Sequence, residues 1–354
     1  RSILFSLLAV LAFATLVLAR VSEDERVRLW HQNGNTWPPK WPSNESPERQ
    51  YRMSLRDREL QLIPGTNERW ENYVQYTQSR LVPRFTEVGF KVVPIPPAIF
   101  QKLKEQVDAG IANWENLRLE RQIDAVFTPL PSKFVDMHAV NQEVIQELQS
   151  MHEEWAGGIQ LRATSAYGTR LYQNGSSLVM HHDKTTTHVI SSIVHIAHKY
   201  DNDDEPWPIE IEDHDGKLHA VNLEPGQMLF YESAACLHGR RSRFKGKYYG
   251  SLFLHYQPVD LSIWNYSIED VIAHVPPHWG EGLIEEKGSR WAGQGLTIDS
   301  LIPDGAPPRV IKGEVVHDIN AYYAEHRPEH LVRANGRVIP VPEGVQIESL
   351  DEEL

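Results

Sequence analysis

Residues 160 to 257 constrain the fold most, because they form a succession of short β-branched and aromatic runs separated by turn residues. Short strands at this spacing are typical of a sandwich or a barrel. The clearest predicted hairpin joins strands at 208–213 and 218–223 through an Asp-Gly turn at Asp215-Gly216, and a further strand follows at 228–231. The sequence therefore predicts a mainly β core.

Two stretches before this core repeat apolar residues every three or four positions, as one face of a helix does. The first runs from Pro97 to about Gln122, and the second covers residues 140–155. Both apolar faces need a partner surface, and the β core offers one. We therefore expect two helices that pack against the core.

The chain of 354 residues with 41% hydrophobic content is long enough to bury one large core with substantial additions. We divide it into four parts. These are a signal peptide or signal anchor at 1–19, a stalk or extended arm at 20–75, helices plus the β domain at 76–258, and a C-terminal extension at 259–354.

The apolar run from Ile3 to Ala19 predicts a secretory signal, or an uncleaved anchor that tethers the rest of the chain to a membrane. The chain ends in SLDEEL, which is similar to the acidic variants of the endoplasmic reticulum retrieval signal. We expect a protein of the endoplasmic reticulum lumen, or of its membrane facing the lumen. Cys236 is the single cysteine, so no intramolecular disulfide can form.

The formal net charge of −13 argues against a nucleic-acid partner, because phosphate backbones require a surplus of Lys and Arg on the contact face. The one basic segment, RRSRFKGK at 240–247, lies beside the candidate site described next. We therefore expect no nucleic-acid partner.

The segment LVMHHDKTTTHV at 178–189 places two histidines and an aspartate side by side at the start of a β-branched run. Alternate side chains of a strand share a face, so His181 and Asp183 point one way and His182 points the other. An imidazole and a carboxylate on one face are two adjacent ligands for a divalent metal. The same pattern also occurs on the polar face of an ordinary strand, so a second element is required.

That element is the stretch LFYESAACLHG, a strand and loop that end in His238. A distant histidine would complete a set of two histidines and one carboxylate, the ligand set of non-haem iron(II) sites. Lys247 follows nine residues later, before an apolar strand. A lysine there could hold the far end of a dicarboxylate as a point charge.

This order resembles the 2-oxoglutarate- and iron(II)-dependent oxygenases, specifically the prolyl 4-hydroxylase family. The likeness covers about residues 162–258, roughly a quarter of the chain, and includes Arg170-Leu171-Tyr172-Gln-Asn-Gly175 upstream of the motif. The resemblance implies a double-stranded β-helix (jelly-roll) core. It also implies iron ligation by His181, Asp183 and His238, pairing of Lys247 with the 2-oxoglutarate carboxylate, a hydrogen bond from Tyr172 to it, O2 as cosubstrate and ascorbate as reductant.

One departure concerns the lysine, because the family usually has ten steps between the distal histidine and the basic residue. A loop one residue shorter would explain the nine steps here, and Lys247 stands eight residues before His255, as in that family. Rival anchors are Arg241, Arg243 and Lys245.

The remaining histidines have less specific settings. We expect His188 and His195 to fill core or cross-strand roles, and His152 and His214 to face solvent. His219 and His255 lie on strands without the strand-loop-His context, and His182 should face away from the site.

The family resemblance implies hydroxylation of peptidyl proline in secretory-pathway proteins, as in procollagen-proline 4-dioxygenases, with a proline-containing peptide or protein as partner. Within the same chemistry, another side chain or a small molecule is an alternative substrate. A second class of function is a cupin-like metal-binding module without oxygenase activity, since one fold hosts many functions. A third is an interaction protein of the secretory pathway.

Overall fold

The structure is a computed structural model, and it describes residues 79–120 and 126–260 without further breaks. It also describes helix α2 (Glu23–Gln32), residue 34, separate residues between 45 and 77, and four short strands beyond 308. The predicted signal segment and most of the C-terminal extension lie outside the described residues. No helix among the described residues is long and apolar enough to cross a membrane.

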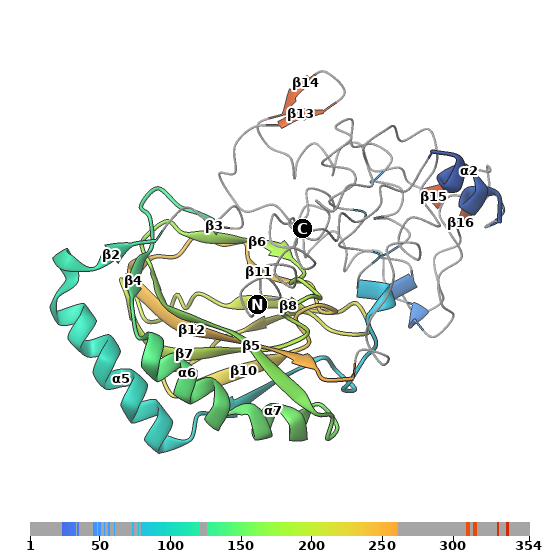
Figure 1. Cartoon of the computed structure of the whole chain (residues 1–354). Coiled ribbons are helices and arrows are strands. Elements are labelled where there is room, and N and C mark those ends of the chain that lie inside the picture. Colours follow the sequence, from blue (N-terminus) through green and yellow to red (C-terminus); the bar gives the residue numbers. More distant parts are fainter. Residues whose placement is uncertain are drawn as a thin grey trace, which may run out of the picture.

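Two antiparallel sheets face each other (Figure 1). The large sheet has seven strands in the order β1-β10-β7-β12-β5-β4-β2, and the small sheet has five in the order β3-β6-β11-β8-β9. The strands of the large sheet are β1 (Phe90–Pro94), β10 (Gln227–Tyr231), β7 (Ile190–Tyr200), β12 (Gly246–Pro258), β5 (Leu161–Tyr172), β4 (Lys133–Val135) and β2 (Arg118–Leu119). Those of the small sheet are β3 (Val126–Phe127), β6 (Ser177–His181), β11 (His238–Arg240), β8 (Ile209–Glu212) and β9 (Leu218–Val221).

Successive strands from β5 to β12 alternate between the two sheets, except that β8 and β9 form a hairpin within the small sheet. This connectivity winds the chain as a double-stranded β-helix, so the predicted fold class is confirmed. The predicted hairpin is also present, with an Asp213–Lys217 turn in which Gly216 has a φ of 88°. Only glycine adopts that φ without strain, which explains the Asp-Gly sequence.

Three helices cover the outer face of the large sheet (Figure 1). They are α5 (Pro97–Ala112), α6 (His138–Glu147) and α7 (Gln149–Trp155). Helix α5 ends ten residues before the predicted Gln122, since a 3-10 turn at Trp114–Asn116 and strand β2 follow it. Leu103 and Val144 of the helices pack with Leu252 and Leu254 of β12 in one buried cluster, and each such side chain contributes about 1.5–3 kcal/mol on burial.

His152 of α7 was expected in solvent, but it is fully buried between the rings of Phe230 and Tyr256. Its Nδ1 donates to the Leu148 carbonyl at 2.7 Å. Burial lowers the pKa of His152 to about 4, although that hydrogen bond acts in the opposite direction. The single helix predicted over 140–155 is two helices, α6 and α7, that meet at Leu148. His152 lies one turn after Leu148 on the buried face, where an imidazole with one satisfied nitrogen replaces a core aromatic.

The arm at 20–75 includes helix α2, where the sequence showed no sustained period. Further along the arm, Arg56 donates two hydrogen bonds to Glu212 of β8, at 3.0 and 2.6 Å, and both side chains are buried. Met53 and Leu60 are buried as well. This part of the arm therefore packs on the small sheet instead of standing away from the domain as a stalk.

The C-terminal extension contributes two short antiparallel pairs among the described residues. They are β13 (Arg309–Ile311) with β14 (Glu314–Val316), and β15 (Leu331–Val332) with β16 (Val338–Ile339). The division of the chain into four parts stays a prediction.

Candidate metal and anion site

The predicted metal ligands come together at one end of the small sheet. His181 ends β6, Asp183 stands two residues later, and His238 begins β11. Strands β6 and β11 are paired with His238 opposite His181. Residues that are 57 positions apart in the sequence therefore become cross-strand neighbours, and one ligand atom from each of the three side chains lies within 4.8 Å of the other two.

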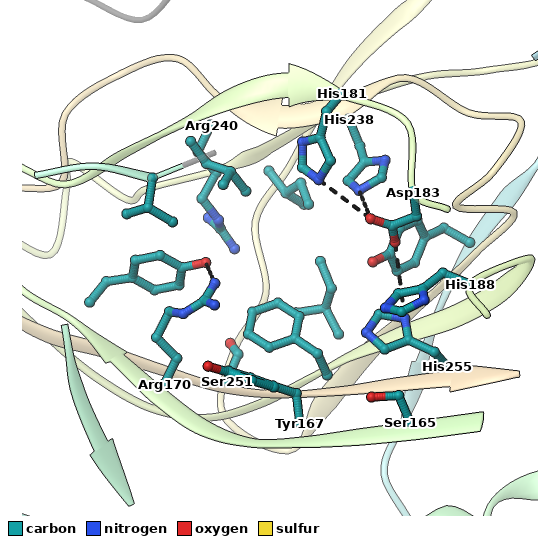
Figure 2. A pocket seen from close by; sticks show the side chains of 17 residues that line it. Ser165, Tyr167, Arg170, His181, Asp183, His188, His238, Arg240, Ser251 and His255 are labelled. Carbon is teal, nitrogen blue, oxygen red and sulfur yellow. Dashed lines mark hydrogen bonds and ion pairs between the residues drawn. The ribbon is translucent and has the colours of Figure 1, made fainter. Parts of the chain in front are cut away.

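The imidazoles of His181 and His238 both direct Nε2 toward the carboxylate of Asp183. His181 Nδ1 donates to the Val179 carbonyl at 2.8 Å, and His238 Nδ1 donates to the Cys236 carbonyl at 2.9 Å. Carbonyls only accept, so both Nδ1 atoms carry hydrogen and both Nε2 lone pairs are available for a metal. The Nε2 atoms lie 3.5 and 3.9 Å from Asp183 Oδ1 (Figure 2).

The protonation states suit a cation ligand set. Burial, together with the neighbouring His181, lowers the pKa of His238 to about 4. Burial on its own would raise the pKa of Asp183, but the neighbouring imidazoles of His181 and His238 outweigh it and hold that pKa well below its usual range. At neutral pH the site therefore offers a neutral imidazole and an ionised carboxylate, which are the forms that bind divalent metals.

A shell of hydroxyl groups supports this end of the cavity. The hydroxyl of buried Tyr231 hydrogen-bonds to Asp183, and burial raises the pKa of that phenol well above its usual value. Ser191 Oγ lies 2.6 Å from Ser233 Oγ and 2.8 Å from His255 Nδ1. The Asp183 amide donates to the Ser233 carbonyl at 2.8 Å, which fixes the backbone that carries the carboxylate.

Arg170 of β5 lies at the opposite end of the cavity from the three ligands (Figure 2). Its Nε and Nη2 donate to the two oxygens of buried Glu120 at 2.7 and 2.9 Å. Its Nη1 donates to the hydroxyl of Tyr172 at 2.8 Å. Glu120 offsets the charge of this guanidinium, and Arg170 orients the Tyr172 hydroxyl.

Arg240 of β11 points toward Arg170 across the same end (Figure 2). Its side chain lies between the rings of Trp207 and Tyr249, with Cζ 4.5 Å from each ring centroid. It donates to the Trp207 carbonyl and, at 3.2 Å, to the Tyr249 hydroxyl. Arg240 is only 3% exposed, and among the described residues no carboxylate pairs with it.

One cavity of about 230 Å³ joins the two ends. Its wall between them is mostly apolar or aromatic, with Ile193, Ile209, Phe253 and Tyr231 among the lining residues. The cavity therefore has a ligand set of net charge −1 at one end. Among the described residues, the other end has a net charge of +1, because Glu120 offsets only one of the two guanidiniums.

Lys247 does not line this cavity. The lysine is exposed, and its Nζ lies 5.4 Å from the ring centroid of Trp114 on the helical side of the large sheet. The pairing of β12 with β7 has an irregularity between Gly246 and Tyr248, which breaks the strict alternation of faces at this point. Lys247 therefore does not face the cavity in this structure.

The rival basic residues also lie outside the cavity lining. Arg241 pairs with Glu210 at 2.5 Å, Lys245 pairs with Glu205 at 2.7 Å, and Arg243 is exposed. By contrast, Tyr172 is buried and lines the cavity, and its hydrogen bond to 2-oxoglutarate stays a prediction.

The other histidines divide between the site and the core. The ring centroids of His188 and His255 lie 3.7 Å apart with the planes tilted by 36°, and both residues line the cavity beside Asp183. His182 is buried but is not among the lining residues, so it faces away as expected. His214 was expected in solvent but is buried, with Nε2 3.0 Å from Glu232.

Comparison of the sequence with known proteins assigns the chain to no family. No family model matches the chain, and no curated protein matches it. Solved structures match with low identity. A prolyl-4-hydroxylase from Pseudomonas putida is 16% identical over 51% of this chain and 98% of its own, with a TM-score of 0.35.

Two further structures cover a similar share. A prolyl hydroxylase from Trichoplax adhaerens, in complex with a hypoxia-inducible factor peptide, is 11% identical over 54% of this chain and 90% of its own, with a TM-score of 0.37. HygX from Streptomyces hygroscopicus, with nickel, 2-oxoglutarate and hygromycin B bound, is 12% identical over 50% of this chain and 86% of its own, with a TM-score of 0.36. Overlaps at this level do not assign a function, so the functional case rests on the cavity itself.

Proposed function

We propose that the protein is an iron(II)- and 2-oxoglutarate-dependent oxygenase. The observation that carries the proposal is the polarity of one cavity. Two imidazoles and a carboxylate lie at one end, and at the other end lies a buried guanidinium that has no carboxylate partner among the described residues. A bound metal ion would neutralise the negative charge of Asp183 at the first end. The far carboxylate of a bound dicarboxylate would neutralise the positive charge of Arg240 at the second end.

His181, Asp183 and His238 would hold the iron. Their donor set fits this metal, because two histidines and one carboxylate are the ligands of non-haem iron(II) oxygenases and leave coordination positions open. When bound, iron(II) with 2-oxoglutarate and O2 supplies the oxidising chemistry that hydroxylates an unactivated carbon.

The chain's own residues have three tasks in this account. Arg240, with Arg170 and Tyr172, binds the far carboxylate of 2-oxoglutarate by charge and hydrogen bonds. Tyr231 and the Ser233 carbonyl hold Asp183 in place. The apolar wall limits water in the cavity, which protects a reactive centre from side reactions.

For the substrate, we propose a prolyl residue in a peptide or protein of the secretory pathway, with ascorbate as reductant. The resemblance of the motif order to prolyl 4-hydroxylases supports this, and so do the apolar N-terminal run and the acidic C-terminal residues. The same chemistry on another side chain or a small molecule is the alternative. Location in the endoplasmic reticulum, facing the lumen, belongs to the same proposal.

The test is turnover of 2-oxoglutarate by the purified protein with iron(II) and ascorbate, against a panel of proline-rich peptides. Succinate is measured, each peptide is examined by mass spectrometry, and Asp183→Ala is the control. Succinate with a one-oxygen gain on proline is expected. Succinate without peptide modification would retain the oxygenase and reject the substrate, whereas no succinate from iron-loaded protein would favour a cupin-like binding module.

A further inference from the structure

Glu232 is a buried carboxylate outside the cavity, and the proposed function does not use it. It stands directly after β10, where the chain leaves the large sheet for β11 of the small sheet. Its side chain is 1% exposed and is not among those that line the cavity. A glutamate is almost never fully buried unless it is paired, so its partners indicate what it does.

Four donors from two other parts of the chain converge on this carboxylate. Oε2 accepts from the Phe85 amide at 3.0 Å, and Oε1 accepts from the Thr86 amide at 2.8 Å and the Thr86 hydroxyl at 2.6 Å. His214 Nε2, from the turn of the β8–β9 hairpin, lies 3.0 Å from Oε1, and we assign a hydrogen to that nitrogen because a carboxylate oxygen accepts. Glu232 therefore ties the segment before β1 and the hairpin to the chain between β10 and β11.

The backbone of Glu232 holds that connection, residues 232–237, from within. The Glu232 carbonyl accepts from the amides of Ala235 and Cys236 at 2.9 and 2.8 Å, and the Glu232 amide donates to the Gly89 carbonyl at 2.8 Å. One residue thus fixes both the shape of the connection and its position against the segment before β1.

The same connection contacts two of the three candidate metal ligands. The Ser233 carbonyl accepts from the Asp183 amide at 2.8 Å, and the Cys236 carbonyl accepts from His238 Nδ1 at 2.9 Å. The hydroxyl of Tyr231, the residue directly before Glu232, hydrogen-bonds to Asp183. The groups that orient Asp183 and His238 are therefore near neighbours of Glu232 in the chain.

A purely structural role and a positioning role for Glu232 differ in what they predict. The amides of Phe85 and Thr86 require an acceptor in any folded chain, so a structural role predicts a loss of stability alone. A positioning role also predicts weaker metal binding by the folded protein, because the supports of Asp183 and His238 move with the connection. Partners of this kind, which orient the ligands of a metal, contribute to metal affinity.

We propose that Glu232 is a positioning residue for the metal centre. Its carboxylate fixes the connection that orients Asp183 and His238, and Thr86 and His214 hold that carboxylate. The inference rests on the proposed function, because it concerns the same metal ligands. It adds that the segment before β1 and the β8–β9 hairpin take part in metal binding through one buried side chain.

The experiment is a titration of the metal-free full-length protein with cobalt(II), which binds nitrogen and oxygen ligands as iron(II) does and has visible absorption that reports its coordination. Glu232→Gln keeps the size of the side chain but replaces one acceptor oxygen with an NH2 group that faces donors. The variant should bind cobalt(II) about 10–100-fold more weakly, the cost of losing an outer-shell partner. The spectrum of its bound cobalt(II) should differ from that of the wild type.

A second pair of variants tests the same claim with a smaller change. Thr86→Val removes the hydroxyl that donates to Glu232, whereas Thr86→Ser keeps it. Thr86→Val should weaken cobalt(II) binding by a smaller factor than Glu232→Gln, and Thr86→Ser should bind as the wild type does. This pair decides the question if Glu232→Gln does not fold.

Glu153→Gln is the matched control. Glu153 of α7 accepts from the Leu161 amide at 2.9 Å, so it also satisfies a backbone amide, but it lies on the helical side of the large sheet. Urea unfolding of each variant measures stability beside the metal titration. Glu153→Gln should lower the free energy of unfolding at most and leave cobalt(II) affinity unchanged.

The outcomes separate the two proposals. If the wild type binds no cobalt(II), the metal site of the proposed function itself fails. If the wild type binds and Glu232→Gln binds equally tightly with the same spectrum, the positioning role is overturned; equal binding by Thr86→Val overturns it where Glu232→Gln does not fold. An equal loss of affinity in Glu153→Gln would also overturn it, because reduced stability would then explain the effect.

Discussion

The two ends of the cavity bury charge in opposite ways. At the metal end, the ionised carboxylate of Asp183 faces His181 and His238, whose Nδ1 hydrogens are used by backbone carbonyls. At the arginine end, Glu120 offsets one guanidinium, and aromatic rings surround the other. Buried charge is costly unless it is paired, so a ligand of opposite sign would stabilise each end.

Because the two ends differ, substitutions can test binding of the proposed metal and binding of the proposed cosubstrate separately. A change at the metal end should remove both ligands, because 2-oxoglutarate needs the metal to chelate. A change at the arginine end should remove the dicarboxylate and leave the metal. The predictions below test that asymmetry.

Asp183→Asn should have the largest effect. The variant keeps the shape of the side chain but loses the one negative charge of the ligand set. Iron(II) affinity should fall by more than the roughly 10–100-fold that loss of an outer-shell partner costs, and succinate formation should be lost with it. Metal content after dialysis, measured by mass spectrometry, checks this. Retention of stoichiometric iron would show that the metal lies elsewhere.

Arg240→Gln should weaken 2-oxoglutarate binding by about 2–5 kcal/mol, the range for truncating one partner of a buried charged pair. Iron content should stay at the wild-type level, because Arg240 lies at the end away from the three ligands. Anaerobic calorimetry together with metal analysis measures both quantities on one sample. If Arg240→Gln also lost the iron, the claim that the two ends bind their ligands separately would be wrong.

The pH dependence of folding should include a contribution from His152, which lies behind the large sheet and outside the cavity. Its folded pKa of about 4 is below the unfolded value, so the unfolded chain binds more protons between pH 6.5 and 4. Stability should therefore be complete above pH 6.5 and fall as the pH decreases to 4, by about 3 kcal/mol at most for this group. Urea unfolding at several pH values measures the slope.

His152→Phe is the control for that slope. Phenylalanine keeps a ring between Phe230 and Tyr256 but cannot take a proton. Between pH 4 and 6.5, the free energy of unfolding of the variant should depend less steeply on pH than that of the wild type, by the amount that one bound proton contributes. An unchanged slope would show that His152 titrates alike in both states.

Lys247→Ala should have the smallest effect on the site. The lysine is exposed beside Trp114, outside the cavity lining, so both iron content and 2-oxoglutarate affinity should match the wild type. The same titration used for Arg240→Gln checks this. A loss of 2-oxoglutarate binding would restore the lysine suggested by the family pattern and contradict the cavity described above.

The metal end was predictable because its signal is local. His181 and Asp183 share a face by simple alternation, and the strand and loop before His238 predict a cross-strand partner. The order of strands was predictable as a class, because short runs and turn residues recur through residues 160–257. The burial of His152 had a partial signal, because this residue stands four positions after Leu148 and eight after Val144 on the predicted apolar face. A histidine's polar character favoured solvent, and only the structure shows that its Nδ1 is satisfied by a backbone carbonyl.

The arginine end required the fold. Its residues come from β5, β11 and β12, and the irregular pairing beside Lys247 cannot be read from the sequence. A partial signal was present, because Arg240 stands two positions after His238 and Arg170 two positions before Tyr172, so each pair shares a strand face. The aromatic rings around Arg240, and its lack of a carboxylate partner among the described residues, appear only when the barrel closes.

The most direct test of the central claim is the visible charge-transfer absorption that develops when a 2-oxo acid chelates iron(II), recorded under nitrogen as 2-oxoglutarate is added. The account predicts that the wild type and Lys247→Ala develop the band at the same 2-oxoglutarate concentration. Arg240→Gln should need at least about 30-fold more, in line with a loss of 2 kcal/mol or more. Absence of the band in the wild type, or an identical titration for Arg240→Gln, would contradict the account.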